Sequence, residues 1–204
     1  MNSTAILDYN AGNLSSLKFT IESLGYRVKI LKNPILLEKF SKLIIPGVGN
    51  YSHAMSFLKK NEWIKPIKNF VSNKNNYLLG ICLGMQILSY KGFEGGVTEG
   101  IQLIEGTVEK LLVKKNCRLP HLGWNNIKIL KDSEILRDIP NNSDFYFAHS
   151  YKFNTQSNKN ISATTKNGQN INAIVEKENV VGVQFHPEKS SVYGKVLLKN
   201  FLEI

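Results

Sequence analysis

The sequence predicts an α/β fold with an open, mostly parallel sheet flanked by helices and an added antiparallel β part. In the first half of the chain, short apolar runs alternate with helical patterns, which is typical of a parallel sheet with helical connections. In the second half, strand-like segments follow one another directly, and Asn167-Gly168 is a hairpin turn signal. No repeat, low-complexity tract or linker interrupts the 204 residues, so we expect a single domain over residues 1–204.

The first half is expected to contain four strands and four helical segments. Leu14, Leu17 and Ile21 recur at helical spacing and Gly25 follows them, which predicts a helix between the first two strands. Pro34 is favourable in the first turn of the next helix. The strands are expected at residues 4–8, 28–31, 43–45 and 77–79, and the helical segments at residues 14–24, 33–40, 52–60 and 66–72.

The second half has strand-like segments without helical patterns between them, which predicts the antiparallel part. It opens with a glycine-rich segment, Gly92–Gly100, which is expected to form a loop. The last segment should be a helix over residues 190–202, because Val196, Leu197 and Phe201 share one side of it. Between them, strands are expected at residues 106–113, 127–130, 145–149, 161–165, 171–175 and 180–185.

The composition excludes several classes of protein. A hydrophobic content of 42% is too high for a disordered chain, and no apolar run reaches the length of a membrane span. The net charge of +10 could indicate a nucleic-acid partner. However, Lys outnumbers Arg 23 to 3 and is scattered along the chain, which favours an ordinary solvated surface. We therefore expect neither a nucleic acid nor a membrane as a partner.

The two cysteines indicate the redox compartment. Cys82 and Cys117 lie in unrelated local contexts and lack the spacing of a metal site. A single pair is too few for a disulfide scaffold, and no secretory signal is visible, so a reduced, cytoplasmic protein is expected. Cys117 lies among basic residues and is expected to be a semi-exposed bystander. No metal ligands are predicted.

The segment Gly80-Ile81-Cys82-Leu83-Gly84 has the pattern of a nucleophile elbow, with cysteine at the position of the nucleophile. An apolar strand precedes it and a helical pattern follows it. The N-terminus of that helix would favour the thiolate form of Cys82, and the N–H of Leu83 could bind a developing oxyanion. The alternative is a buried cysteine at an ordinary turn, and the glycine spacing alone leaves both interpretations open.

A second motif, Gln184-Phe185-His186-Pro187-Glu188, favours the catalytic interpretation. It follows an apolar strand, and ligands of open α/β sheets bind at the carboxyl ends of strands. Residues two positions apart in an extended segment share a side, so Glu188 can reach the imidazole of His186 and fix its tautomer. This gives a nucleophile, a base and an orienting carboxylate in the order Cys82, His186, Glu188.

These two motifs together resemble the class I glutamine amidotransferases, a family of triad glutaminases with an open α/β sheet and an antiparallel addition. The resemblance narrows to the glutaminase subunits of imidazole glycerol phosphate synthase and covers essentially the whole chain. The segments that carry it are Pro46–Gly49, Pro120–Asn125, Tyr146–Tyr151, His186–Ser190 and Leu198–Leu202.

The resemblance implies that Cys82 attacks the carboxamide of L-glutamine, that His186 transfers the proton and that Glu188 holds His186, without a cofactor. It also assigns three further groups of residues. The oxyanion hole would combine Leu83 with the Pro46–Gly49 loop through Val48 and Gly49. The substrate-binding residues would be Gly47, Gln86, His149, Ser150 and Tyr151, and the candidates for the partner interface are Asn13, Trp124, Asn125 and Lys189.

The chain shows no synthase domain and no phosphate-binding loop, so the ammonia must be used by another polypeptide. The resemblance implies a heterodimer with a (βα)₈-barrel cyclase that makes imidazole glycerol phosphate and AICAR in histidine biosynthesis. A paralogous glutaminase that supplies a surface-sugar amidotransferase, for lipopolysaccharide, flagellin or capsule, is the alternative. A cysteine peptidase and an inactive interaction module are less favoured, because no peptide-binding domain is visible and all three triad residues are present.

Overall fold

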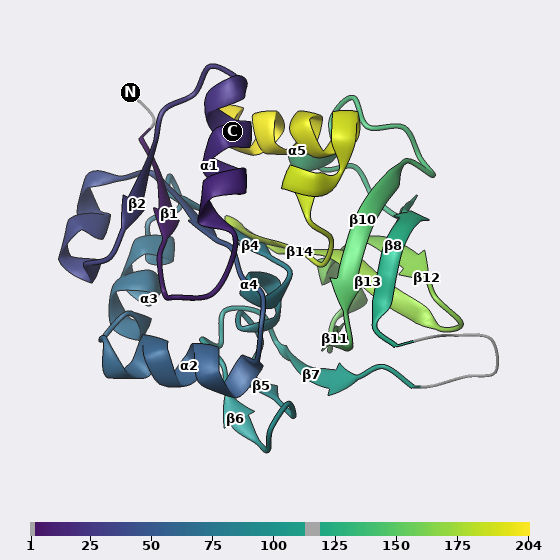
Figure 1. Ribbon diagram of the computed structural model, residues 1–204, viewed down its shortest axis with the longest axis horizontal. Coiled ribbons are helices and arrows are strands. Elements are labelled where there is room, and N and C mark those ends of the chain that lie inside the picture. Colours follow the sequence, from purple (N-terminus) through teal and green to yellow (C-terminus); the bar gives the residue numbers. More distant parts are fainter. Residues whose placement is uncertain (1–2, 113–118) are drawn as a thin grey trace.

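The computed structural model describes residues 3–112 and 119–204, and Cys117 lies outside these ranges. Its main element is a sheet of eight strands in the order β2-β1-β3-β4-β14-β13-β12-β9 (Figure 1). The five strands from β2 to β14 run parallel, and pairing is antiparallel from β13 onward. The predicted fold, a mostly parallel open sheet with an antiparallel addition, is therefore confirmed.

The strands of this sheet are short, as the apolar runs predicted. The parallel strands are β2 Val28–Leu31, β1 Thr4–Leu7, β3 Lys42–Ile45, β4 Tyr77–Ile81 and β14 Val180–Val183, and the antiparallel ones are β13 Asn170–Lys177, β12 Ile161–Lys166 and β9 Lys128–Ile129. Four of the five parallel strands are buried along nearly their whole length, because helices cover both faces of this part of the sheet.

Two pairs of helices cover the parallel strands. Helices α1 (Leu14–Ser23) and α5 (Ser191–Glu203) lie on one side, and α2 (Tyr51–Lys60) and α3 (Ile64–Ser72) lie on the other (Figure 1). The sheet separates two hydrophobic cores, and successive strand residues point to opposite ones. Ile6 packs in the core shared with α1 and α5, whereas Leu7 packs in the core shared with α2 and α3. The shorter helical segments are α4 Leu83–Gln86, η1 Pro34–Lys39, η2 Glu134–Leu136, η3 Asn158–Asn160 and η4 Pro187–Lys189.

Two smaller sheets lie beside the carboxyl ends of the parallel strands. One pairs β10 with β8, and the other has the order β11-β7-β5-β6 (Figure 1). Their bounds are β5 Lys91–Gly92, β6 Thr98–Glu99, β7 Gly106–Lys110, β8 His121–Asn126, β10 Asp144–His149 and β11 Tyr151–Thr155. Residue 150, between β10 and β11, is where the chain passes from one small sheet to the other.

Several predicted elements were wrong. Strands β8 and β11 were missed, because β8 buries only His121 and β11 only Phe153, so neither shows a clear apolar alternation. The strand expected over residues 127–130 is reduced to Lys128–Ile129, and the glycine-rich loop contains the short pair β5 and β6. The helix expected at residues 33–40 is a 3-10 helix.

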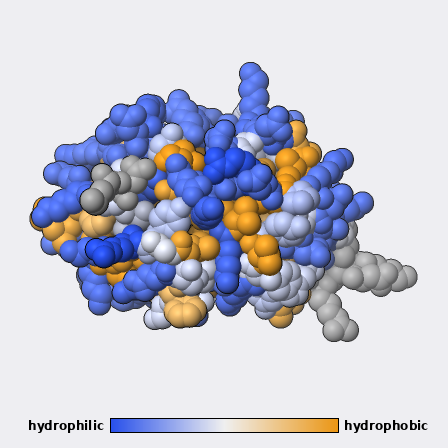
Figure 2. Space-filling view, turned by 90° about the horizontal axis from the view of Figure 1, so that it is seen from above, coloured by the Kyte–Doolittle hydropathy of each residue, from blue (hydrophilic) through white to orange (hydrophobic). Residues whose placement is uncertain are grey.

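The surface is mostly polar. The view in Figure 2 shows hydrophilic residues over most of the visible face, with separate hydrophobic patches between them. In the two described ranges, we find no helix with the length and hydropathy needed to cross a membrane.

Candidate active site

The elbow and the His-Pro-Glu motif meet at one edge of the sheet. Strands β4 and β14 are parallel neighbours, with Ile81 opposite Val183. Cys82 follows directly after β4, and its N–H donates to the carbonyl of Val183 at 2.8 Å. His186 comes three residues after Val183. The order of strands therefore brings two residues about a hundred positions apart to the same place.

The backbone at Cys82 has the strained conformation of a nucleophile elbow, with φ +54° and ψ −105°. The flanking glycines make this turn possible. A Cβ on Gly80 would lie 2.6 Å from the carbonyl oxygen of Gly84, and a Cβ on Gly84 would lie 1.7 Å from the carbonyl oxygen of Ile45. Only glycine fits at either position, because both contacts are with backbone atoms that cannot move away.

Replacing Gly84 with alanine is therefore expected to destabilise the fold strongly. The clash with the Ile45 carbonyl should lower the free energy of unfolding by about 3 kcal/mol, as overpacking against rigid neighbours does. Gly25→Ala is a matched control, because no heavy atom lies within 4 Å of its Cβ position and only the φ of +87° is unfavourable; a loss of about 1 kcal/mol is expected there. Urea unfolding measures both, and equal losses would show that the elbow has room for a side chain.

The helix after the elbow differs from the prediction. Helix α4 ends at Gln86 after a single turn, so its dipole is much weaker than that of a long helix. The expected stabilisation of a thiolate at Cys82 by a helix N-terminus is therefore small. The polar contacts of the sulfur come from elsewhere: the amide Nε2 of Gln184 lies at 3.7 Å and the carbonyl oxygen of Ala148 at 3.8 Å.

His186 and Glu188 form a buried pair. His186 Nδ1 lies 3.0 Å from Glu188 Oε1, and the two side chains are 3% and 7% exposed. Because a carboxylate accepts, Nδ1 carries the proton, and Nε2 is left as the acceptor in the neutral ring. Among the described atoms, Nε2 is buried without a hydrogen-bond partner. Burial alone would lower the pKa of His186, but the neighbouring Cys82 and Glu188 outweigh it and raise the pKa to about 10. Once Nε2 has taken the proton of Cys82, the ring therefore holds it as an imidazolium beside the ionised sulfur.

The loop Pro46–Gly49, which was predicted to complete the oxyanion hole, blocks it in this structure. The N–H of Leu83 donates to the carbonyl oxygen of Gly47 at 3.3 Å, so one predicted donor is occupied by the loop that should supply the other. Val48 and Gly49 are exposed at the cavity wall. Tyr9 fixes the start of the loop, because its hydroxyl donates to the carbonyl oxygen of Pro46 at 2.6 Å. The predicted donors are thus adjacent, but they do not point together into an open hole.

A cavity of about 240 Å³ lies above Cys82. Most of the predicted site residues line it, whereas Gly47, His186 and Glu188 do not. Three further lining residues, Glu94, Pro120 and Ala148, were not predicted as site residues. The complete lining of this cavity is Val48, Gly49, Cys82, Leu83, Gln86, Glu94, Pro120, Ala148, His149, Ser150 and Tyr151.

The carbonyl oxygen of Tyr151 organises one wall of this cavity. It accepts from Gln86 Nε2 at 2.9 Å and is 2.7 Å from Nδ1 of His149, which must therefore carry a proton. His149 Nε2 then accepts from Nδ1 of His121 at 3.0 Å. Burial lowers the pKa of His149 to about 3 and that of His121 to about 4, so both rings are neutral at pH 7.

The four candidates for a partner interface occupy different environments. Trp124 is 55% exposed, so it is not a core residue, and its ring meets Tyr146 edge-on at 6.1 Å. The ammonium of the exposed Lys189 lies 5.7 Å from the centre of the same Tyr146 ring. Asn125 points inward to Nε2 of His121 at 3.2 Å. Asn13 is the N-cap of α1, which is a sufficient structural reason for its presence.

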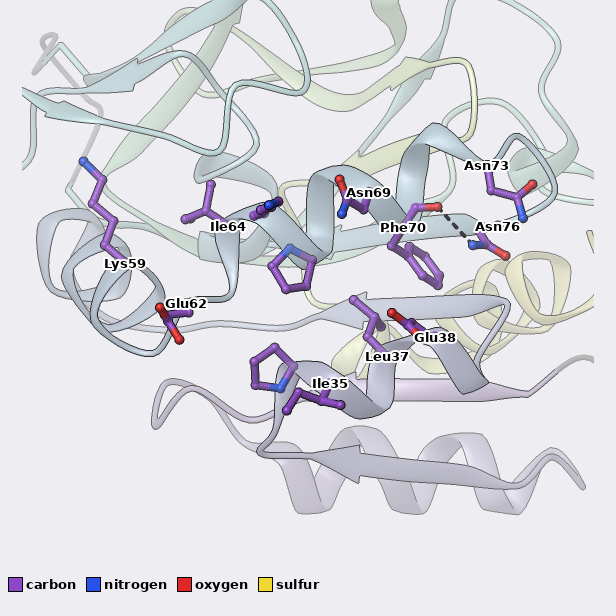
Figure 3. Close-up of a pocket in the computed structure, with 13 residues that line it drawn as sticks. Ile35, Leu37, Glu38, Lys59, Glu62, Ile64, Asn69, Phe70, Asn73 and Asn76 are labelled. Atoms are coloured by element: carbon purple, nitrogen blue, oxygen red, sulfur yellow. Dashed lines mark hydrogen bonds between the residues drawn. The ribbon is translucent and has the colours of Figure 1, made fainter.

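A larger cavity lies elsewhere among the described residues. It measures about 960 Å³ and lies between η1 and α3, with Leu37, Ile64 and Phe70 among its lining residues (Figure 3). It contains none of the predicted site residues, so size alone does not identify the active site. In the described part of the chain, no group of three or more His, Cys, Asp or Glu side chains could hold a metal ion.

Comparison with known proteins agrees with this geometry. The family model described as glutamine amidotransferase class-I matches residues 5–204. A crystal structure of a glutamine amidotransferase has a TM-score of 0.77 at 18% identity and covers 99% of this chain and 98% of its own. PurLQS from Thermotoga maritima has a TM-score of 0.75 at 18% identity and covers 100% of this chain and 99% of its own. At these identities the two structures show the fold alone.

The chain belongs to the class I glutamine amidotransferase family. Within it, the chain is similar to imidazole glycerol phosphate synthase subunit HisH 1 of Campylobacter jejuni (strain RM1221), with 42% identity over 98% of this chain and 99% of that protein. It is also 42% identical to subunit HisH of Caldanaerobacter subterraneus subsp. tengcongensis, over 98% of this chain and 97% of that protein. The predicted family and the prediction of an enzyme are confirmed.

Proposed function

We propose that this chain is the glutaminase subunit of an imidazole glycerol phosphate synthase and hydrolyses L-glutamine to L-glutamate and ammonia. One observation carries the catalytic part of the proposal. Cys82 lies at a strained elbow beside a buried His186–Glu188 pair whose Nε2 is available to accept a proton. The identity of 42% to HisH subunits over nearly the whole chain supports the particular enzyme.

The chemistry follows from the three side chains. The thiol of Cys82 gives its proton to Nε2 of His186, and the sulfur attacks the carboxamide carbon of glutamine. The imidazolium then protonates the leaving nitrogen, which departs as ammonia and leaves a γ-glutamyl thioester. Water, deprotonated by the neutral His186, hydrolyses this thioester to glutamate and restores the thiol. Glu188 holds the tautomer of His186 and stabilises its charged form.

The cavity wall supplies groups for the amino-acid end of the substrate, which carries both the α-ammonium and the α-carboxylate. Glu94 is the one carboxylate among the lining residues and suits the α-ammonium of glutamine. The α-carboxylate is attached to the same carbon, and we assign Ser150 and Tyr151, at the junction of β10 and β11, to it. His149 shapes this wall of the substrate site, because both of its ring nitrogens are hydrogen-bonded within the protein. Gln86 has both amide hydrogens in use within the protein, so only its oxygen is left for a substrate contact.

The ammonia is used by a partner. We propose a cytoplasmic heterodimer with a (βα)₈-barrel cyclase subunit, with the cluster of Trp124, Tyr146 and Lys189 at the interface. The exposure of Trp124 and the Lys189 cation above Tyr146 support this choice of face, because exposed aromatic and cationic side chains are frequent interface anchors.

The test separates the candidate functions directly. The chain is mixed with glutamine and with a peptide library, alone and with a histidine-pathway cyclase or a surface-sugar amidotransferase. Release of ammonia from glutamine that increases only with the cyclase is expected. Activation by the sugar amidotransferase instead would assign the chain to that pathway, peptide cleavage would indicate a peptidase, and no turnover under any condition would indicate an interaction module.

Replacing Glu188 with glutamine should slow the reaction less than replacing His186 with alanine. The amide oxygen of the variant can still accept from Nδ1, so the tautomer is kept and only the charge is lost. We expect kcat to fall on the order of 10²-fold for Glu188→Gln and about 10⁴-fold for His186→Ala. Steady-state ammonia release in the complex measures both. Full activity of Glu188→Gln would remove Glu188 from the triad, and a loss equal to that of His186→Ala would give it a larger role.

A further inference from the structure

Gln184 contacts the sulfur of the proposed nucleophile and has no role in the mechanism above. It directly follows β14 and lies two positions before His186, and both side chains are buried beside Cys82. Its side chain is completely buried, where an amide is costly unless it is hydrogen-bonded. Nε2 donates toward Cys82 Sγ at 3.7 Å, and Oε1 accepts from Gln86 Nε2 at 3.2 Å.

The orientation of this amide is fixed by its neighbours. The carbonyl oxygen of Tyr151 can only accept, so Gln86 must present Nε2 to it. The same Nε2 then faces Gln184, which must present its oxygen. The amide nitrogen of Gln184 is therefore left for Cys82. The carbonyl oxygen of Tyr151, acting through Gln86, thus determines that the N–H group of Gln184, and not its oxygen, points at the sulfur.

The two polar contacts of the Cys82 sulfur favour opposite protonation states. The carbonyl oxygen of Ala148, at 3.8 Å, can accept from a thiol and repels a thiolate. The N–H of Gln184 donates to the sulfur and is strengthened when the sulfur is charged. Since the one-turn helix α4 contributes little, Gln184 is the main uncharged group that favours the thiolate.

We propose that Gln184 is a positioning residue that stabilises the thiolate of Cys82 and aims its sulfur, through an amide held by Gln86 and Tyr151. The proposal rests on the proposed function, because it assigns Gln184 to the same nucleophile. No bond is made or broken at Gln184. Its contribution is to the transfer of the thiol proton to Nε2 of His186, which becomes more favourable as the resulting anion is better solvated.

The other titratable groups near Cys82 can be named. His186 follows β14 and takes the proton, and Glu188 accepts a hydrogen bond from Nδ1 of His186. His149 on β10 stays neutral because burial lowers its pKa to about 3, and Tyr9 stays neutral because burial and the neighbouring Cys82 raise its pKa far above 10. Glu94 lies on the cavity wall, where it disfavours a second negative charge. Substitutions of Gln184 leave all of these groups in place.

The test measures the pH dependence of the alkylation of Cys82 by iodoacetamide in the full chain, followed by mass spectrometry of the Cys82 peptide. Gln184→Met removes the donor and keeps the length, whereas Gln184→Glu keeps an acceptor for Gln86 and places a carboxylate beside the sulfur. We expect the pH midpoint to rise by about one unit for Gln184→Met and further for Gln184→Glu. The glutaminase kcat of the complex should fall at least about 10-fold, with KM nearly unchanged.

The order of the two variants distinguishes this role from a structural one. If Gln184 only filled space, the nearly isosteric Gln184→Glu would resemble the wild type more than Gln184→Met does. Gln169→Met is the matched control, because the Gln169 amide bonds to the carbonyl of Leu112, away from the sulfur, and its midpoint should not move. An unchanged midpoint in both Gln184 variants would overturn the proposal. A wild-type Cys82 that is not alkylated at any pH would instead contradict the proposed nucleophile.

Discussion

Replacing Cys82 with alanine is expected to abolish glutamine hydrolysis, with a loss in kcat of at least about 10⁴-fold. The elbow places this sulfur at the floor of the cavity, and no other described side chain in the lining is a thiol. The fold should be retained, because alanine is smaller and can adopt the φ of Cys82 at a similar cost. Synthesis by the complex from added ammonia should survive, because the acceptor reacts on the partner.

The measurement is ammonia release from glutamine, together with product formation from ammonium salts, in complexes that contain Cys82→Ala or the wild-type chain. Cys117→Ala is the matched control, because Cys117 stays predicted as a bystander, and it should keep wild-type turnover. Substantial glutaminase activity in Cys82→Ala would refute the proposed triad. Loss of the ammonia-dependent reaction as well would show that the substitution disturbs assembly and not only chemistry.

Partner binding is expected to raise glutaminase kcat by at least about 10²- to 10³-fold, the usual effect of one oxyanion donor. In this structure the Gly47 carbonyl occupies the N–H of Leu83, so the hole is closed. Rotating the peptide between Gly47 and Val48 would withdraw this oxygen and turn the N–H of Val48 inward. Gly47 permits such a rotation, and no larger residue could replace it, because its Cβ would lie 2.1 Å from the Tyr9 hydroxyl.

The rotation should depend on the partner, which is proposed to dock near the same edge. The test compares steady-state kinetics of the chain alone, with the cyclase, and with the cyclase and its acceptor ligand. The rise should appear in kcat and leave KM nearly constant, because the recovered N–H contacts the oxyanion of the transition state and not the ground-state carboxamide. A complex that contains Cys82→Ala is the control for ammonia released by the partner preparation. Equal kcat in all three conditions would show that the closed hole seen here does not limit the reaction.

The sequence was most informative where local pattern and backbone chemistry agree. The elbow at Cys82 could be predicted because Gly80 and Gly84 are each required by contacts with backbone. The meeting of Cys82 with His186 followed from the rule that parallel strands end at the same edge of a sheet. Glu188 does contact His186, at 3.0 Å, but it lies in the 3-10 helix η4 and not in an extended segment, so the contact was predicted for the wrong local reason.

The parts that could not be predicted depend on contacts between distant segments. Strand β8 shows no apolar core face in the sequence, because its apolar residues Leu122 and Trp124 are exposed and its one buried side chain is a histidine. The closed state of the oxyanion loop arises from a single contact between Gly47 and Leu83, which has no sequence signature. Gln184 could have been noticed, since it lies two positions before His186 in the same motif, but its donor orientation depends on Gln86 and on the carbonyl of Tyr151.

The most direct test of the proposed mechanism is to identify the acylated residue. The complex with acceptor ligand is quenched in acid during glutamine turnover, digested and analysed by mass spectrometry. We expect a γ-glutamyl thioester on the peptide that contains Cys82, present in the wild-type chain and absent from Cys82→Ala. Continued turnover with the γ-glutamyl group on a different residue, or with no acylated residue while Cys82→Ala remains active, would contradict the assignment of Cys82 as the nucleophile.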